Sequence, residues 1–144
     1  MSNQHYLKLQ HMYAKAPINV FYQPIISIED GQAEIKMTIT EKMHHSAKGV
    51  HGSVYFKLLD DAAFFAANSV EVDVFVLTSD FHIRFIRPVS EGVLTATGWV
   101  IHAGRKNILA QSVLHDANGK LIGSGQGSFA RSSLPLNSDC GYEL

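Results

Sequence analysis

Two adjacent carboxylates in an apolar stretch are the first residues with the capacity for chemistry. Asp60 and Asp61 lie within residues 51–68, which are otherwise rich in Phe, Leu, Val and Ala. Burying an unpaired charge is costly, so each carboxylate requires a partner. Lys57 is the only cation within helical reach of the two. A carboxylate that this lysine leaves unpaired has a raised pKa and can act as a base or a nucleophile. The spacing does not decide which of the two carboxylates is unpaired. The alternative is that both carboxylates face a polar groove.

The start of the same stretch offers a second chemical element. Residues 51–68 are apolar on nearly every side, which predicts a buried helix. The first amides of a helix are unpaired donors at its positive end, and Gly52 leaves the backbone uncovered there. Such amides can polarise a carbonyl oxygen as negative charge develops on it. The alternative is ordinary capping, by Ser53 or by a tight loop.

The elements before this helix position it. Residues 4–14 predict an N-terminal helix that Pro17 ends, because proline disfavours helical geometry in the residue before it. Asp30 and Gly31 predict a tight turn between two strands. In the second strand, residues 35–39 alternate between apolar and polar side chains.

Four strands are expected after the helix. The order is therefore one helix, two strands, a long buried helix and a four-strand meander, which predicts an α+β fold with an antiparallel curved sheet wrapped around one long central helix. We expect a single domain over residues 1–144, with an N-terminal helix over 1–16 and a loosely ordered tail over 131–144. The four expected strands lie near residues 78–88, 92–102, 107–116 and 121–130.

Composition excludes several classes of protein. Twelve Lys and Arg against 13 Asp and Glu leave a formal net charge of -1, and no basic patch for nucleic acid is visible. No run is long and apolar enough to cross a membrane, and no secretory signal is visible, so we expect a cytoplasmic protein. A single cysteine, Cys140, cannot form an internal disulfide. The 8 histidines do not have the spacing of a metal site, so no metal is expected.

The segment His51-Gly52-Ser53, with Asp60 nine positions after the histidine, resembles the His-Gly-Gly…Asp signature of hot-dog thioesterases. The likeness is to the phenylacetate-degradation type of acyl-CoA thioesterase. It continues through the strand at residues 78–88 and into the closing hairpin. The resemblance implies a hot-dog fold and hydrolysis of acyl thioesters. It also implies a homodimer with a joined sheet, or a dimer of dimers.

The resemblance assigns roles to particular residues. It implies that Asp60 activates water or attacks the thioester carbonyl, and that the Gly52 amide polarises that carbonyl. His51 is the motif histidine. A hydroxyl from the neighbouring subunit matches Thr78, with Ser79 as a near alternative. No cofactor is implied apart from CoA as part of the substrate.

CoA phosphates in such proteins lie near basic loop residues. Arg105 and Lys106 are the first candidates here, with Arg84 and Arg87 as weaker ones. The alternative for Arg105 and Lys106 is a solvated hairpin tip. We expect the acyl group to lie in an apolar pocket beside the helix, lined by Phe56, Leu59 and Phe64.

Two positions depart from the family pattern. The second glycine of the motif is Ser53, and an Asn or Gln often found in the preceding loop is replaced by His45, beside Ser46. Two other functions therefore stand beside hydrolysis. One is a hot-dog dehydratase in which His51 and Asp60 form the catalytic pair. The other is a non-catalytic module that binds acyl-CoA. The acyl group, and the choice between CoA and an acyl carrier protein, are left open by the sequence.

Overall fold

The part of the chain that the structure describes contains one antiparallel sheet of six strands. The computed structural model describes residues 3–144. The strand order across the sheet is β1-β2-β4-β5-β6-β3. None of the described helices is long and apolar enough to span a membrane. The strands are β1 (Ile25–Glu29), β2 (Gln32–Thr38), β3 (Val74–Phe85), β4 (Val93–Ala103), β5 (Asn107–His115) and β6 (Leu121–Pro135).

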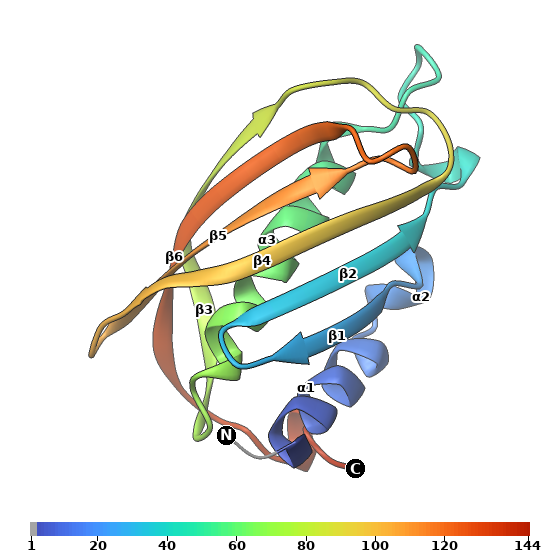
Figure 1. Cartoon of the computed structure of the whole chain (residues 1–144). Helices are drawn as coiled ribbons and strands as arrows, with labels where there is room; N and C mark the ends of the chain where they lie inside the picture. Colours follow the sequence, from blue (N-terminus) through green and yellow to red (C-terminus); the bar gives the residue numbers. More distant parts are fainter. Residues whose placement is uncertain (1–2) are drawn as a thin grey trace.

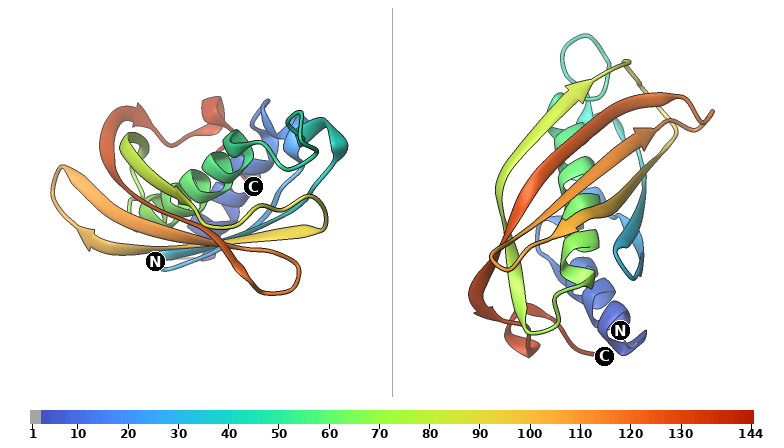
Figure 2. Two further views of the ribbon diagram at one scale, coloured as in Figure 1. Left: turned by 90° about the horizontal axis from the view of Figure 1, so that it is seen from above. Right: turned by 60° about the vertical axis from the view of Figure 1, so that its left-hand side comes forward.

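The long helix α3 (Gly52–Ser69) lies against the concave face of this sheet, as Figures 1 and 2 show. Leu58, Leu59 and Ala62 on the helix are fully buried, because they face the inward side chains of the central strands. The helix α1 (Asn3–Lys15) lies beside α3 and packs against β1, and the short helix α2 (Asn19–Tyr22) follows it. The predicted α+β architecture, a curved antiparallel sheet around one long helix, is confirmed.

The local signals of the first half are confirmed as well. Helix α1 ends at Lys15, two residues before Pro17. The turn between β1 and β2 contains Gly31 at φ +71°, a conformation that glycine adopts without steric cost.

The predicted meander of four strands is wrong in one respect. Strands β4, β5 and β6 are consecutive neighbours, but β3 lies at the far edge and pairs with β6. Strand β4 pairs with β2 instead, across the segment that contains α3. Local periodicity marks a strand without indicating its neighbour in the sheet, because pairing across a helix is a long-range choice. As a result β3 is an edge strand.

The C-terminal tail, predicted to be loosely ordered from residue 131, is also corrected. Strand β6 continues to Pro135, and a short 3-10 helix spans Ser138–Cys140. The last residues contact α1, since the Nδ1 atom of His5 lies 2.7 Å from the Tyr142 hydroxyl and Lys15 pairs with Glu143 at 3.0 Å. Polar side chains typical of loops here make specific contacts with a helix more than 120 residues away in the chain.

Close contact between α3 and the sheet depends on Gly98 in β4. A Cβ atom at this position would lie 2.3 Å from the Ala62 carbonyl oxygen and 2.7 Å from the Ala63 nitrogen. We expect Gly98→Ala to lower the free energy of unfolding by about 1–3 kcal/mol or more, because backbone atoms cannot move aside as a side chain can. Urea denaturation measures the change. Thr97→Ala, on the outer face of the same strand, is the control, and an equal effect in both variants would contradict the prediction.

Candidate active site

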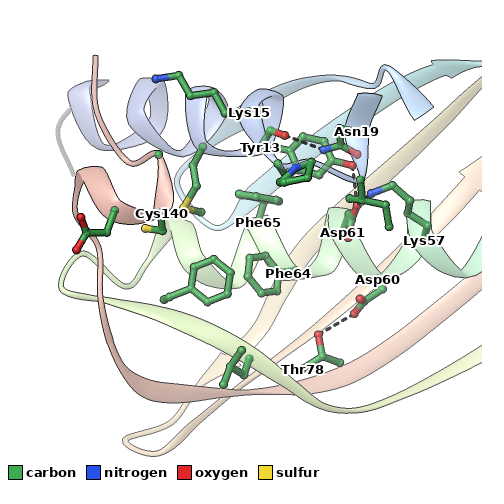
Figure 3. Close-up of a pocket in the computed structure, with 18 residues that line it drawn as sticks. Tyr13, Lys15, Asn19, Lys57, Asp60, Asp61, Phe64, Phe65, Thr78 and Cys140 are labelled. Atoms are coloured by element: carbon green, nitrogen blue, oxygen red, sulfur yellow. Dashed lines mark hydrogen bonds and ion pairs between the residues drawn. The ribbon is translucent and has the colours of Figure 1, made fainter. Parts of the chain in front are cut away.

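An apolar cavity of about 650 Å³ lies between α1, α3, β3 and the C-terminal segment. Asp60 and Thr78 lie at one end of it, as Figure 3 shows. Aromatic rings line the middle, and the centroids of Phe64 and Phe75 are 5.2 Å apart. The cavity therefore joins a carboxylate to an apolar chamber. The other lining residues are Met12, Tyr13, Lys15, Ala16, Pro17, Ile18, Asn19, Lys57, Asp61, Phe65, Leu77, Asp139, Cys140 and Gly141.

Asp60 is a half-buried carboxylate with one hydrogen-bond donor. Thr78 Oγ1 donates to Asp60 Oδ1 at 2.9 Å. Burial raises the pKa of Asp60 to about 6; the Thr78 hydrogen bond and Lys57 lower it, and the charge of Asp61 raises it. A carboxylate with this pKa is largely ionised at neutral pH and is a stronger base than an exposed one.

Asp61 has a different environment, although it is the next residue. Its Oδ2 atom accepts from Lys57 Nζ at 2.6 Å and from the Tyr13 hydroxyl at 2.7 Å. Lys57 also lies over the ring of Tyr22, 4.9 Å from its centroid. The lysine and the tyrosine therefore satisfy Asp61. Among residues 3–144, Asp60 is thus the carboxylate left without a cation partner, which the spacing in the sequence had not decided.

Thr78 reaches Asp60 within the same chain. The family resemblance implied that a neighbouring subunit supplies this hydroxyl, whereas the contact observed here joins two residues of one chain. The reason lies in the strand order: β3 is at the sheet edge and passes directly beside α3. The pairing of β3 with β6 shifts register between Thr78 and Asp80, so Ser79 lies within an irregularity of the strand.

The start of α3 is capped by His51. Its Nδ1 atom accepts from the Ser53 amide at 3.0 Å and lies 2.8 Å from the Ser53 hydroxyl. The backbone carbonyl of His51 accepts from the Val54 amide. Within residues 3–144, the Gly52 amide has no such acceptor, and a Cβ atom at Gly52 would lie 3.0 Å from the Phe85 ring. The first helical amide is therefore free to donate a hydrogen bond. The residue that caps the helix is His51, whereas the sequence had suggested Ser53 as the alternative.

A second, open cleft of about 700 Å³ runs along α3 from this helix start to Asp60. Its wall includes His51, Gly52, Phe56 and Asp60. Asp60 borders both the cleft and the cavity. Gly52 and Asp60 are eight residues apart, which is about 12 Å along a helix axis. One carbonyl group therefore cannot contact both groups of the same chain.

Comparisons with known proteins show the family of this chain. A model of the thioesterase superfamily matches residues 48–122, slightly more than half of the 144 residues. The chain belongs to the thioesterase superfamily. The predicted thioester hydrolase is confirmed at this level. The matched residues contain the helix start, Asp60 and Thr78 of this thioesterase-superfamily chain.

Individual relatives support the same family. A 1,4-dihydroxy-2-naphthoyl-CoA hydrolase of Listeria monocytogenes is 31% identical over 99 residues, which are 68% of this chain and 80% of the relative. The acyl-coenzyme A thioesterase PaaI of Escherichia coli is 37% identical over 83 residues, or 57% of this chain and 58% of that protein. The solved structure of the E. coli PaaI protein from the phenylacetic acid degradation operon has a TM-score of 0.84 at 26% identity, and the match covers 93% of this chain and 97% of that one. The hot-dog fold of the phenylacetate-degradation type is therefore confirmed.

Other predicted site residues of this thioesterase-superfamily chain lie elsewhere. His45 is exposed in the loop before α3, where its Nδ1 atom accepts from the Ala47 amide at 3.1 Å. It lines neither the cavity nor the cleft. Leu59 is fully buried toward the sheet and lines neither of them, whereas Phe64 lines the cavity and Phe56 the cleft.

The four basic residues predicted for CoA are not gathered around Asp60. Arg105 and Lys106 form the hairpin between β4 and β5, away from both hollows. Arg84 lines a small hollow on the outer face of the sheet with Trp99. Arg87 follows β3, and its carbonyl accepts from a tyrosine hydroxyl of α3 at 2.6 Å.

Residues near both chain termini line the cavity, although the sequence did not predict this. Tyr13 of α1 and Cys140 of the C-terminal segment line the cavity, and Tyr13 contacts Asp61 directly. Tyr13 carried a signal, since it lay on the apolar face of the predicted helix. That signal indicates burial without showing which element covers the residue.

Within residues 3–144, no cluster of three His, Cys, Asp or Glu side chains has a metal-binding arrangement.

Proposed function

We propose that this protein hydrolyses an acyl-CoA thioester, with Asp60 as the general base that activates water. The observation that carries the proposal is the position of Asp60. It is a desolvated carboxylate held by Thr78, at the place where an apolar cavity opens into a cleft. A carboxylate with a pKa of about 6 can take a proton from water as the water attacks the carbonyl carbon.

The two hollows match the two halves of such a substrate. In this arrangement the apolar acyl group lies in the cavity beside Phe64 and Phe75. The thioester carbonyl lies beside Asp60. The pantetheine arm leaves along the cleft past Phe56, toward solvent. Water adds to the carbonyl carbon, the C–S bond breaks, and the products are the free acid and the CoA thiol.

The donor for the carbonyl oxygen comes from a second copy in this proposal. The separation of about 12 Å along α3 keeps the Gly52 amide away from the Asp60 of its own chain. A homodimer with two-fold symmetry brings the helix start of each copy to the Asp60 of the other. The edge strand β3 supports such a dimer, because an uncovered edge can pair with another strand. Leu77 and Phe85 on it are also exposed.

We also propose that Arg105 and Lys106 bind the phosphates of CoA. Arg131 supports their hairpin: it pairs with Glu71 at 2.7 Å and donates to the Gly104 carbonyl. This contact ties the hairpin to the C-terminal end of α3, away from the start of the cleft. A nucleotide bound by one copy therefore meets these two residues only if they come from another copy.

The experiment is the release of free thiol from acetyl-, octanoyl-, palmitoyl- and phenylacetyl-CoA, followed with a thiol reagent. Turnover of at least one of these supports the proposal. Saturable binding without turnover would favour the acyl-CoA binding module. Hydration of an enoyl-CoA without thiol release would favour the dehydratase.

Replacement of Thr78 is expected to move the pH dependence of this reaction. The base acts in its ionised form, so kcat/KM decreases as the pH falls below about 6. The Thr78 hydrogen bond lowers the pKa of Asp60, whereas Asp61 raises it and Lys57 lowers it. Thr78→Val removes the donor, raises that pKa and shifts the acidic limb of the profile to higher pH. Thr78→Ser keeps a hydroxyl and is the control. An unshifted limb in the valine variant would show that the hydrogen bond does not act on the base.

A further inference from the structure

The cavity beside Asp60 has walls of two origins. Residues within the segment matched by the superfamily model supply Asp60, Phe64, Phe75 and Thr78. The remaining wall comes from outside that segment. Met12 and its neighbours in α1 cover one side, and Cys140 with its neighbours closes the end. We call this second part the terminal wall; it consists of residues 12–13, 15–19 and 139–141.

Specific contacts hold the terminal wall against the catalytic helix. The Tyr13 hydroxyl donates to Asp61, the residue next to the proposed base. Asn19 Nδ2 donates to the Tyr13 carbonyl at 2.7 Å. The C-terminal part approaches α1 closely at Gly141, where φ is +85° and an added Cβ atom would lie 3.5 Å from the Met12 Cα atom. The wall is therefore built into the fold and has a defined shape.

Its C-terminal part lies at the far end of the cavity from the chemistry, whereas Tyr13 reaches back to Asp61. In Figure 3 Asp60 and Thr78 lie at one end, Cys140 and Lys15 at the other, and Phe64 and Phe65 between them. Met12 is 5% exposed and belongs to the main core cluster. An acyl group that starts at Asp60 and runs between the phenylalanine rings ends against Met12 and Cys140.

We propose that the terminal wall, through Met12 and Cys140, sets the maximum length of an uncharged, apolar acyl group that this protein accepts. The inference rests on the proposed function and extends it to the substrate. The cavity favours apolar groups, because a charged acyl end would lose its hydration among the phenylalanine rings, and Lys15 at the far end is already paired with Glu143 at 3.0 Å. Each methylene group that a hydrophobic pocket accepts or rejects changes kcat/KM by about 10-fold or more.

The test compares kcat/KM over a series of straight-chain acyl-CoAs from acetyl to palmitoyl. In Met12→Trp and Cys140→Trp the added ring shortens the cavity. We expect the ratio of kcat/KM for the longest good substrate to that for acetyl-CoA to fall about 10-fold or more. Ala14→Trp, which adds the same ring on the exposed face of α1, is the control and is expected to keep the wild-type profile. An unchanged chain-length profile in both wall variants, while the wild type turns over acyl-CoA, overturns the inference and leaves the proposed function standing.

A second measurement does not depend on turnover or on a substitution. Cys140 is the single cysteine of the chain, so alkylation by N-ethylmaleimide reports on the wall alone. We expect the fatty acid product of the longest good substrate to slow this alkylation, and acetate to leave it unchanged. If no acyl-CoA is hydrolysed, the fatty acids of the same series serve as probes, and the proposed function has failed separately. Alkylation at the same rate with and without every fatty acid overturns the inference.

Discussion

Asp60→Asn is expected to lower kcat for acyl-CoA hydrolysis by about 10²–10⁴-fold, the range that a positioned general base contributes. Asparagine keeps the shape of the side chain and can still bond the Thr78 hydroxyl, but it cannot take a proton from water. The loss is expected in kcat, with a smaller change in KM, because the acyl cavity stays intact. Thiol release under substrate saturation measures it.

Asp61→Asn is the matched control for this change. Its carboxylate is bound by Lys57 and Tyr13, so we expect it to retain far more activity than Asp60→Asn and to lose stability, since two polar groups lose their charged partner. Equal losses of kcat in the two variants would show that neither carboxylate acts as a specific base. An unchanged kcat in Asp60→Asn would remove Asp60 from the mechanism.

Asp60→Asn, which lowers activity, is expected to raise the stability of the folded protein. The pKa of Asp60 is raised from 3.8 to about 6 in the folded protein. Its contribution to stability is therefore fully present below about pH 4 and is lost as the pH rises through about 6. We expect the Tm of Asp60→Asn to exceed that of the wild type at pH 8, and the difference to shrink at pH 5. Such a gain at the cost of activity is typical of a strained active-site group.

Mixed dimers are expected to recover activity from two inactive variants. Asp60→Asn removes the base, and Gly52→Pro removes the amide donor at the first position of α3, where proline is tolerated. His51 already has an extended backbone, with ψ of 143°, which suits a residue before proline. In a dimer that contains one copy of each variant, one of the two shared sites keeps both groups. A mixed dimer purified away from both parent dimers therefore has about half of the wild-type activity, and an unpurified random mixture has about a quarter.

The control for this experiment separates the amide from the steric change. Gly52→Ala also places a Cβ atom against the Phe85 ring, 3.0 Å away, but it keeps the amide. It should therefore be more active than Gly52→Pro, which we expect to lose about 10²-fold in kcat as a lost oxyanion donor does. Co-expression of the two tagged chains, purification through both tags and thiol release measure the recovery. No recovery in a mixed dimer of confirmed composition would contradict a site shared between Asp60 of one copy and the Gly52 amide of the other.

Much of the fold was predictable from local patterns. The apolar run over residues 51–68 predicted α3 because a helix that is apolar all round must be buried. Pro17 and Gly31 marked the end of a helix and a turn through backbone preferences that act within a few residues. The strand order was not predictable in this way. The partner of β3 is β6, about 40 residues further along, and no local pattern specifies it.

The same distinction between local and long-range information applies to the candidate site. Residue types and spacing alone indicated an unpaired carboxylate in α3 and a free amide at its start, because burial cost and helix geometry act locally. Only the tertiary structure decided that Lys57 and Tyr13 both bind the Asp61 carboxylate and that neither binds Asp60, since Tyr13 comes from a helix 48 residues away. It also showed that Thr78 contacts Asp60 of its own chain and that α1 and Cys140 line the cavity. The pKa of a carboxylate and the length of a pocket depend on every element that packs around them, and those elements meet only in the folded chain.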